Sequence, residues 1–577
     1  MNLIKKILQS LRQYRTLALV TPVLVVVGAA CELLVPLLLS YLIDHGVSQG
    51  DIRSVWLYSG AMLAATLAGL GFSVAGAVTG ARASAGLAHN LRADLFARIQ
   101  EFSFRNLDQF SPASLITRMT TDVNSVQNAF SILTRMAIRA PANLLLAFII
   151  CLTINPSLSL IYLAVTPFLV AGMYWITTHA HPHFQKMFAL YDDFNLVVEE
   201  NLRGIRVVKT FVREQQQQEK FNDVSARIYE TASRAERLLT LTTPLMEASL
   251  YICMLLIAWF GAHQIVAGSF TIGQLMSMVT YTMQILISLM MMSMMMVMIV
   301  TSRAAAERVV AVLETDSDLT DPAHPRLTLT DGRIEFKNVN FSYTGKNDSL
   351  CIQNMNLTIP AGSTIGIIGD TGSGKTSLVQ LIPRLYDVTS GQVLVGGHDV
   401  RAYSLATLRT GISMVLQKNV LFGGTIRENL HWGQPCATQE QLEQACRQAQ
   451  IHDFITSLPQ GYDSPVEQGG TNFSGGQRQR LCLARALLRQ PRILILDDAT
   501  SALDSQTEKR ISRAWQTDLP DTTVIIIAQR LSSVQNCDQI AILHQGRLAG
   551  LGTHAQLLKN NRVYQEIYAS QAQGDHA

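Results

Sequence analysis

The chain has 577 residues, of which 48% are hydrophobic, and its mean hydropathy is +0.20. These values are high for a wholly water-soluble protein and the chain is long for one domain, so we expect part of it to lie in a membrane. The formal net charge of +3 is small for this length, which excludes a global basic field of the kind that binds nucleic acid.

Six long apolar windows precede residue 305, and each reaches the ~20 residues that a helix needs to cross a ~30 Å hydrocarbon layer. A large buried helical core is the alternative, but six successive windows are hard to bury in a soluble domain of this length. The sequence therefore predicts an all-α membrane domain of six transmembrane helices. The windows are residues 17–43, 55–83, 136–154, 157–178, 240–267 and 274–300.

Loop length and charge orient these spans. Three connections are short and nearly free of Lys and Arg, whereas the other two are long and basic, carrying for example Arg92 and Arg98 in one and Lys186 and Arg203 in the other. The positive-inside rule therefore places the long connections and the N-terminus in the cytoplasm. We expect a multi-pass protein of the cytoplasmic membrane, in contact with the lipid bilayer.

The long connections read as helical extensions of the spans, with a break at Gly204. We do not assign a metal site to His179, His181 and His183, because Pro182 is expected to interrupt the helix that would align them. The eight cysteines contain no C-x-x-C pair and favour reduced buried thiols over zinc or disulfides.

Three features inside the spans bear on the transported substrate. Glu32 and Glu247 are carboxylates where charge is costly, so each either attracts a cationic substrate or pairs with another helix. Half of the 20 methionines lie between Met276 and Met298. Methionine suits surfaces that accept varied apolar partners, but it is also ordinary filler in an apolar span, and both readings stay open.

The composition becomes polar after residue 305, with two prolines and a glycine, which predicts a linker at 306–332. A second domain, 333–577, follows. In it the strand-like run Thr364–Ile368 precedes Gly369-Asp370-Thr371-Gly372-Ser373-Gly374-Lys375-Thr376, which matches G-x-x-x-x-G-K-[ST], and a helix-compatible stretch begins at Ser377. The glycines let backbone N–H groups face phosphate, Lys375 adds positive charge, and the Thr376 hydroxyl is a Mg²⁺ ligand. We therefore expect an α/β P-loop domain that binds a nucleoside triphosphate.

The stretch Ile493 to Asp504, ILILDDATSALD, reads as a buried strand that delivers a carboxylate to this site. Asp497 takes the position that holds Mg²⁺ through water, and Asp498 takes the position of the residue that activates the attacking water.

Between these motifs, Ser474-Gly475-Gly476-Gln477 resembles the signature motif of ABC (ATP-binding cassette) ATPases. Further motifs fall in the order that the family has. Tyr343 resembles the aromatic residue that stacks on adenine, Gln417 the Q-loop glutamine that serves the nucleotide and its Mg²⁺, and Ser501-Ala502-Leu503-Asp504 the D-loop. With six spans ahead of one cassette, the whole chain resembles an ABC exporter half-transporter.

The resemblance implies ATP and Mg²⁺ as ligands and a second half-transporter as partner, because in this family each ATP lies between the P-loop of one cassette and the signature of the other. It also implies that short coupling helices near 110–118 and 201–212 transmit cassette closure to the spans, and that Glu467 senses the partner's connection. Ordinary helix packing is the alternative for both segments.

Two residues depart from the family pattern. Asp498 stands where a glutamate is usual, and Gln529 stands where a histidine is usual. Aspartate is one methylene shorter than glutamate, and glutamine cannot carry the positive charge of histidine, so we expect this half-site to be catalytically weak. The intact signature completes the partner's site instead. A heterodimer with one weak and one complete site is therefore our preferred reading, similar to heterodimeric bacterial multidrug exporters, and a slowly hydrolysing homodimer is the alternative.

The expected function is ATP-driven export of hydrophobic, amphipathic or cationic small molecules, such as drugs or lipids. A lipid flippase and an ATP-gated channel or regulatory subunit stay open as alternatives. The substrate itself is not readable from the sequence.

Overall fold

The computed structural model describes residues 2–345, 349–499, 506–507, 510–511 and 520–574, and it divides the chain into two compact units. One unit comprises residues 1–100 and 112–315. The other comprises residues 101–111 and 316–577.

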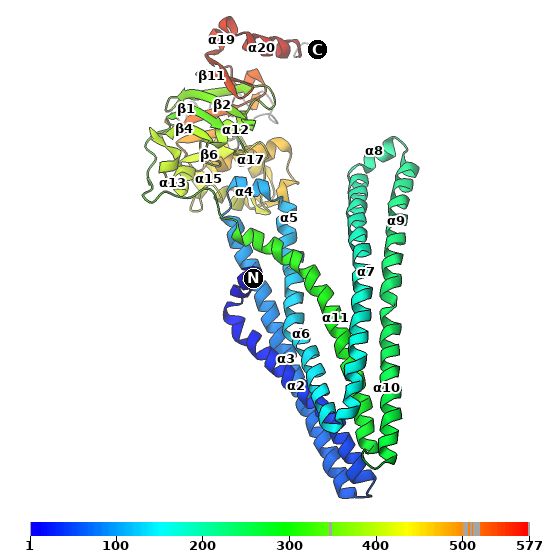
Figure 1. Cartoon of the computed structure of the whole chain (residues 1–577). Coiled ribbons are helices and arrows are strands. Elements are labelled where there is room, and N and C mark those ends of the chain that lie inside the picture. The colour runs from blue at the N-terminus through cyan, green and yellow to red at the C-terminus, as the bar shows by residue number, and fades with distance from the viewer. Residues whose placement is uncertain (1, 346–348, 500–505, 508–509, 512–519, 575–577) are drawn as a thin grey trace. The chain divides into compact units, whose positions relative to one another are not determined.

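The first unit is entirely helical (Figure 1). Among the described residues, six helical segments are long and apolar enough to cross a membrane, which confirms the predicted membrane domain. Its helices are α1 (Asn2–Gln9), α2 (Arg15–Tyr41), α3 (Ile52–Gln100), α5 (Pro112–Thr117), α6 (Val123–Ile154), α7 (Pro156–Arg203), α8 (Ile205–Thr210), α9 (Glu214–Thr240), α10 (Thr242–Val266) and α11 (Ile272–Glu314), with π-helical turns at Leu42–Val47 and Arg118–Asp122.

Helices α7 and α9 extend side by side and are joined at one end by the short helix α8 (Figure 1). Gly204 ends α7 and begins α8, at the predicted break. The expectation at Pro182 is wrong, because α7 runs through both Pro167 and Pro182. A proline removes one backbone hydrogen bond and causes a local clash, but a helix anchored on both sides survives that loss.

Helix α11 continues past residue 305 to Glu314. Its last turns are rich in alanine and in long charged side chains, which favour a helix even where the sequence is no longer apolar. An ion pair with a buried carboxylate holds this part of the helix, because Arg308 donates two hydrogen bonds to Asp122 at 2.6 and 2.8 Å. Asp122 is only 1% exposed.

At its other end, α11 is joined by polar groups to α2 and to the π-helical turn Leu42–Val47 that follows α2. The Asp44 carboxylate accepts from the Thr271 hydroxyl at 2.7 Å and from the Gly273 N–H at 3.0 Å. Further along the same face, the Tyr281 hydroxyl donates to the Leu33 carbonyl at 2.6 Å. These contacts hold the first and last spans together because unpaired polar groups are costly in an apolar medium.

Of the two carboxylates predicted inside the spans, Glu32 pairs with Arg139 of α6 at 2.5 Å and accepts from Ser73 of α3. Glu247 is exposed. The pairing reading therefore holds for Glu32.

The second unit is an α/β domain built on two main sheets. The sheet orders are β12-β11-β3-β10-β9-β6 and β2-β1-β4-β5, with a separate β7-β8 pair. In the six-stranded sheet, only β12 is antiparallel to its neighbour. The strands are β1 (Ile334–Phe341), β2 (Ile352–Ile359), β3 (Thr364–Gly369), β4 (Ser390–Val395), β5 (His398–Asp399), β6 (Ile412–Val415), β7 (Gly424–Thr425), β8 (Pro465–Val466), β9 (Ile493–Asp497), β10 (Thr523–Ile527), β11 (Gln539–His544) and β12 (Arg547–Gly552). The helices are α4 (Phe104–Gln109), α12 (Lys375–Gln380), α13 (Leu405–Gly411), α14 (Ile426–His431), α15 (Gln439–Gln448), α16 (His452–Ser457), α17 (Gly475–Leu487), α19 (His554–Asn560) and α20 (Arg562–Gly574).

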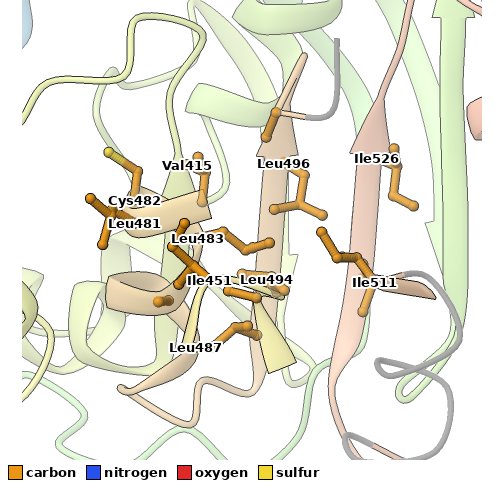
Figure 2. Close-up of a cluster of buried hydrophobic side chains, with 14 of the residues drawn as sticks. Val415, Ile451, Leu481, Cys482, Leu483, Leu487, Leu494, Leu496, Ile511 and Ile526 are labelled. Carbon is orange, nitrogen blue, oxygen red and sulfur yellow. The ribbon is translucent and has the colours of Figure 1, made fainter. Parts of the chain in front are cut away.

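Strand β9 separates two hydrophobic cores. Ile493 and Ile495 face the core that includes the antiparallel sheet, whereas Leu494 and Leu496 face the core formed with the helices. Figure 2 shows Leu494 and Leu496 packed with Leu483 and Leu487 of α17. This packing on both faces is typical of a parallel sheet and holds the carboxyl end of β9 in place.

Helix α4 belongs to this second unit although its sequence lies between two spans. Tyr386 donates to the Asp108 carboxylate at 2.7 Å, and the Phe104 ring lies edge-on to the Tyr386 ring. The segment that groups with the cassette is thus 101–111, which only partly overlaps the expected coupling segment 110–118.

Candidate functional site

Four parallel strands bring the predicted site residues to one edge of the sheet. The register places Ile527 of β10 opposite both Asp497 of β9 and Ile367 of β3. Val415 of β6 lies opposite Leu496. The loops that follow β3, β6, β9 and β10 therefore leave the sheet at its carboxyl edge, where ligands of open α/β sheets bind.

The loop after β3 has a backbone that only glycine adopts easily. Gly369 has φ +151°, and a side chain there would meet the Leu543 carbonyl oxygen. Gly374, the residue before α12, has φ +93°. The loop can therefore curl tightly and turn its N–H groups toward one point, as a phosphate cradle requires.

Two side chains in this loop fit a bound phosphate. The Lys375 ammonium donates to the Gly369 and Asp370 carbonyls, both at 2.8 Å. Burial lowers the pKa of Lys375, although the carboxylates of Asp370, Asp497 and Asp498 act in the opposite direction. The Ser373 hydroxyl is buried and has no hydrogen-bond partner within the described structure. An anion in the loop would accept a hydrogen bond from Ser373 and would pair with the Lys375 ammonium.

The two motifs meet where α12 faces β9. The Thr376 hydroxyl donates to Asp497 Oδ1 at 3.1 Å. Asp497 is 2% exposed, and burial, with the neighbouring Asp498 charge, raises its pKa. A hydroxyl and a carboxylate at this spacing are the kind of oxygen donors that suit Mg²⁺, which would compensate the buried negative charge.

Asp498 has a constrained backbone. Its φ of +54° lies in the left-handed region, which aspartate and asparagine enter more readily than other non-glycine residues. Its N–H donates to the Ile527 carbonyl at 3.0 Å. Its side chain accepts from Gln529 Nε2 at 3.2 Å, so the two residues that depart from the family pattern are in direct contact. Burial raises the pKa of Asp498, and the charges of Lys375 and Arg530 partly offset that effect.

Tyr343 lies beside the helix that follows the loop. Its hydroxyl lies 2.8 Å from the Ser377 Oγ, and its ring is edge-on to Phe341 and Tyr386. Tyr343 is 39% exposed, which leaves surface on which another aromatic group can stack.

The signature residues form the start of α17. Ser474 and Gln477 bond each other's backbone N–H groups, an arrangement that stabilises a helix N-terminus. Ser474 and Gly475 are exposed. This N-terminus is therefore free to meet an anion from outside the chain.

The structure adds one contact that sequence reasoning missed. Gln479 is 1% exposed and donates to the Asp498 carbonyl at 3.1 Å, which ties α17 to the end of β9. Its position two residues after the signature motif did not reveal this contact, because the burial of Gln479 is seen only in the structure. Gln417 is exposed two residues beyond β6, and the predicted D-loop Ser501–Asp504 lies outside the described residues.

Comparison with known families decides the identity of the chain. The model of the ABC transporter transmembrane region matches residues 19–290, and the ABC transporter model matches residues 352–501. An uncharacterized ABC transporter ATP-binding protein of Bacillus subtilis, YfiB, is 35% identical over 570 residues, which covers 98% of each chain. The chain belongs to the ABC transporter family.

Two further proteins connect this ABC transporter to exporters. The ATP-dependent lipid A-core flippase of Syntrophus aciditrophicus is 31% identical over 490 residues, covering 84% of this chain and 80% of the flippase. The solved structure of a bacterial Atm1-family ABC exporter with ATP bound has a TM-score of 0.79 and 27% identity, covering 97% of this chain and 98% of that one. The chain is thus a multi-pass membrane ABC exporter with an ATPase domain coupled to transport.

Proposed function

We propose that this exporter is one half of a heterodimer whose own P-loop forms a weakened ATP site, while its signature motif completes the partner's site. The contact between Gln529 and Asp498 carries the proposal, since both unusual residues lie in the same half-site and bond each other at 3.2 Å. The Asp498 carboxylate is one methylene shorter than the general base of the usual site, and the Gln529 amide cannot carry the positive charge of a histidine.

The remaining site residues have the following proposed roles. Tyr343 stacks on the adenine of ATP, and the loop from Gly369 to Ser377 cradles its phosphates. Thr376, Gln417 and Asp497 hold Mg²⁺. Ser474 to Gln477 contact the ATP held by the partner.

The residues of the phosphate-binding loop match the usual motif and support ATP binding at the weakened site. Lys375 and the unpartnered Ser373 hydroxyl lie in a loop shaped for phosphate. ATP held there without rapid hydrolysis would keep two cassettes together, while the partner's complete site turns over.

We further propose export of hydrophobic or amphipathic compounds from the cytoplasmic side across the cytoplasmic membrane. The methionines of α11 support this reading, because Met276, Met283 and Met290 are all exposed and lie seven residues apart. This spacing puts them on one helix face, whereas Met278 is fully buried. A stripe of flexible, polarizable side chains is a suitable wall for varied apolar substrates.

Lipid transport is the second candidate, and the similarity to a lipid A-core flippase favours it. ATP-dependent uptake of a hydrophobic dye into inside-out vesicles, compared with flipping of a labelled lipid, separates the two. Passive dye flux that ATP opens but does not drive would instead support a gated channel.

Purification of this chain alone tests the heterodimer. We expect ATP hydrolysis at a rate barely above background, with Asp498→Asn causing little further loss. Robust hydrolysis that Asp498→Asn abolishes would remove the need for a second kind of subunit and would favour the homodimer.

A further inference from the structure

The C-terminal helix α20 reaches the segment that carries Gln529. Gln571, near the end of α20, donates from Nε2 to the Gln529 carbonyl at 2.8 Å. Its Oε1 accepts from the Leu531 N–H at 2.8 Å. One side-chain amide thus bonds the backbone on both sides of Arg530, as a neighbouring strand would.

The position of Gln571 is set by packing rather than by chance contact. Tyr564 of α20 is fully buried, and Ile567 packs against the same hydrophobic core. Tyr564, Ile567 and Gln571 follow at intervals of three and four, so they share one face of the helix. Leu531, which receives the hydrogen bond, is itself 3% exposed in that core.

The bonded segment leads directly to the nucleotide site. Gln529 uses its side chain on Asp498 Oδ2 while its backbone carbonyl is held by Gln571. Hydrogen bonds therefore link Gln571 to Gln529 and Gln529 to Asp498, from the C-terminal helix to the residue that follows β9.

We infer that Gln571 is a positioning residue for Gln529, so that α20 controls how long ATP stays in this site. The inference rests on the proposed ATP-holding site and gives Gln529 a part in it: the side-chain amide beside Asp498 donates a hydrogen bond to the γ-phosphate of bound ATP. When Gln571 is absent, the segment 529–531 loses two of its hydrogen bonds, Gln529 is no longer held toward the phosphate, and nucleotide leaves faster.

The test is the dissociation rate of mant-ATP from the purified full-length chain in lipid nanodiscs, chased with excess ATP in the presence of Mg²⁺. Gln571→Ala should dissociate about tenfold faster than wild type, the effect of losing two ordinary hydrogen bonds. Gln571→Glu keeps an acceptor for Leu531 but has no donor for Gln529, so its rate should fall in between.

Gln565→Ala is the matched control, because Gln565 lies on the same helix and bonds the Leu558 carbonyl, away from the site. It should dissociate like wild type. Equal acceleration in both alanine variants would mean that α20 acts only through general stability, and an unchanged rate in Gln571→Ala would also overturn the inference.

Gln529→Ala separates this inference from the function on which it rests. If Gln529→Ala is fast and Gln571→Ala adds nothing to it, Gln571 acts through Gln529 as inferred. If Gln529→Ala is fast but Gln571→Ala is not, only the inference fails. If neither variant changes the rate, the proposed role of Gln529 fails as well.

Discussion

The residue that most distinguishes this chain is Asp498, and its structure gives a physical reason for the aspartate. Its left-handed φ of +54° suits aspartate better than the longer glutamate. Gln529, which donates to the Asp498 carboxylate, is neutral, so the two residues form a hydrogen bond and not an ion pair. This chemistry agrees with the proposal that the site holds ATP longer than a site with glutamate and histidine would.

Asp498→Asn should stabilise the nucleotide-free chain at neutral pH. Folding raises the pKa of Asp498 above its ordinary 3.8, mainly through burial, so folding favours the uncharged carboxyl group. Stability from this group is present below pH 3.8 and is lost as the pH rises through the folded-state pKa. Asparagine is uncharged and equally suited to the backbone, so the melting temperature at pH 7.5 should rise by about 1–3 °C.

The gain should shrink when the melt is repeated near pH 5, because wild-type Asp498 then becomes protonated more often. Asp463→Asn is the control, since the hydrogen bond from Arg427 lowers the pKa of Asp463 and its loss should not stabilise the chain. A melting temperature for Asp498→Asn at or below wild type at both pH values would contradict this account.

Among single residues, the sequence predicted that the motif residues lie together at the nucleotide site. It did not predict the side chains of other helices that bond their backbone. The motif residues after β3 and β9 lie together because both strands end at the same sheet edge. Gln479 and Gln571 could not be assigned, because a polar residue on a helix face carries no local signal of the distant backbone that it bonds.

Among the elements, α11 has a charged anchor outside the apolar span. Asp122 is buried and takes two hydrogen bonds from Arg308, whose side chain is 51% exposed, so removing the carboxylate loses both bonds while water solvates the guanidinium. Asp122→Ala should lower stability by about 1.5 kcal/mol, the contribution of a charge-assisted hydrogen bond whose cation stays in contact with water. Thermal unfolding of the detergent-solubilised chain, followed by size-exclusion chromatography, measures the change.

Glu307→Ala provides the comparison on the same helix. Glu307 pairs with Arg303 at 2.9 Å, but both side chains are more than half exposed. Such a pair contributes at most about 0.5 kcal/mol, so its loss should barely change the melting temperature. Equal effects from the two substitutions would show that the Asp122 pair does not anchor α11.

The six spans were predictable because apolar length is a direct requirement of the bilayer. The short connection between the third and fourth spans ends in residue types typical of a helix start, since Asn155 caps α7 and Pro156 opens it. The end of α11 and the continuity of α7 through Pro182 were not predictable, because helix propensity and packing outweigh local composition there. Nor could the sequence reveal that α4 groups with the cassette, which depends on the contact between Asp108 and Tyr386.

For the molecule as a whole, the charge asymmetry of the loops predicts the orientation in the membrane. Cys436 in the ATPase domain is the exposed cysteine among the eight, and it should be protected from a membrane-impermeant maleimide in intact cells. Ser48→Cys adds a thiol in the connection between the first two spans, at an exposed position. That variant should label in intact cells, and Cys436 should label only after permeabilisation. The reverse pattern would invert the proposed topology.

The family could be inferred at this scale because the motifs occur in a fixed order along the chain. The number of different subunits could not be inferred, because in the composite sites that we propose each chain supplies only one half. The weakened site that we propose lacks the usual glutamate and histidine, and both can be introduced into this chain at positions 498 and 529.

The most direct test is the ATPase rate of the purified full-length chain carrying Asp498→Glu and Gln529→His together. Restoring the usual base and histidine should raise turnover at least about tenfold over the slow wild type, because a positioned general base contributes that much or more. Lys375→Ala in the same background should abolish the gain. A wild-type chain that already hydrolyses ATP rapidly, and that the double substitution does not accelerate, would contradict the weakened-site account.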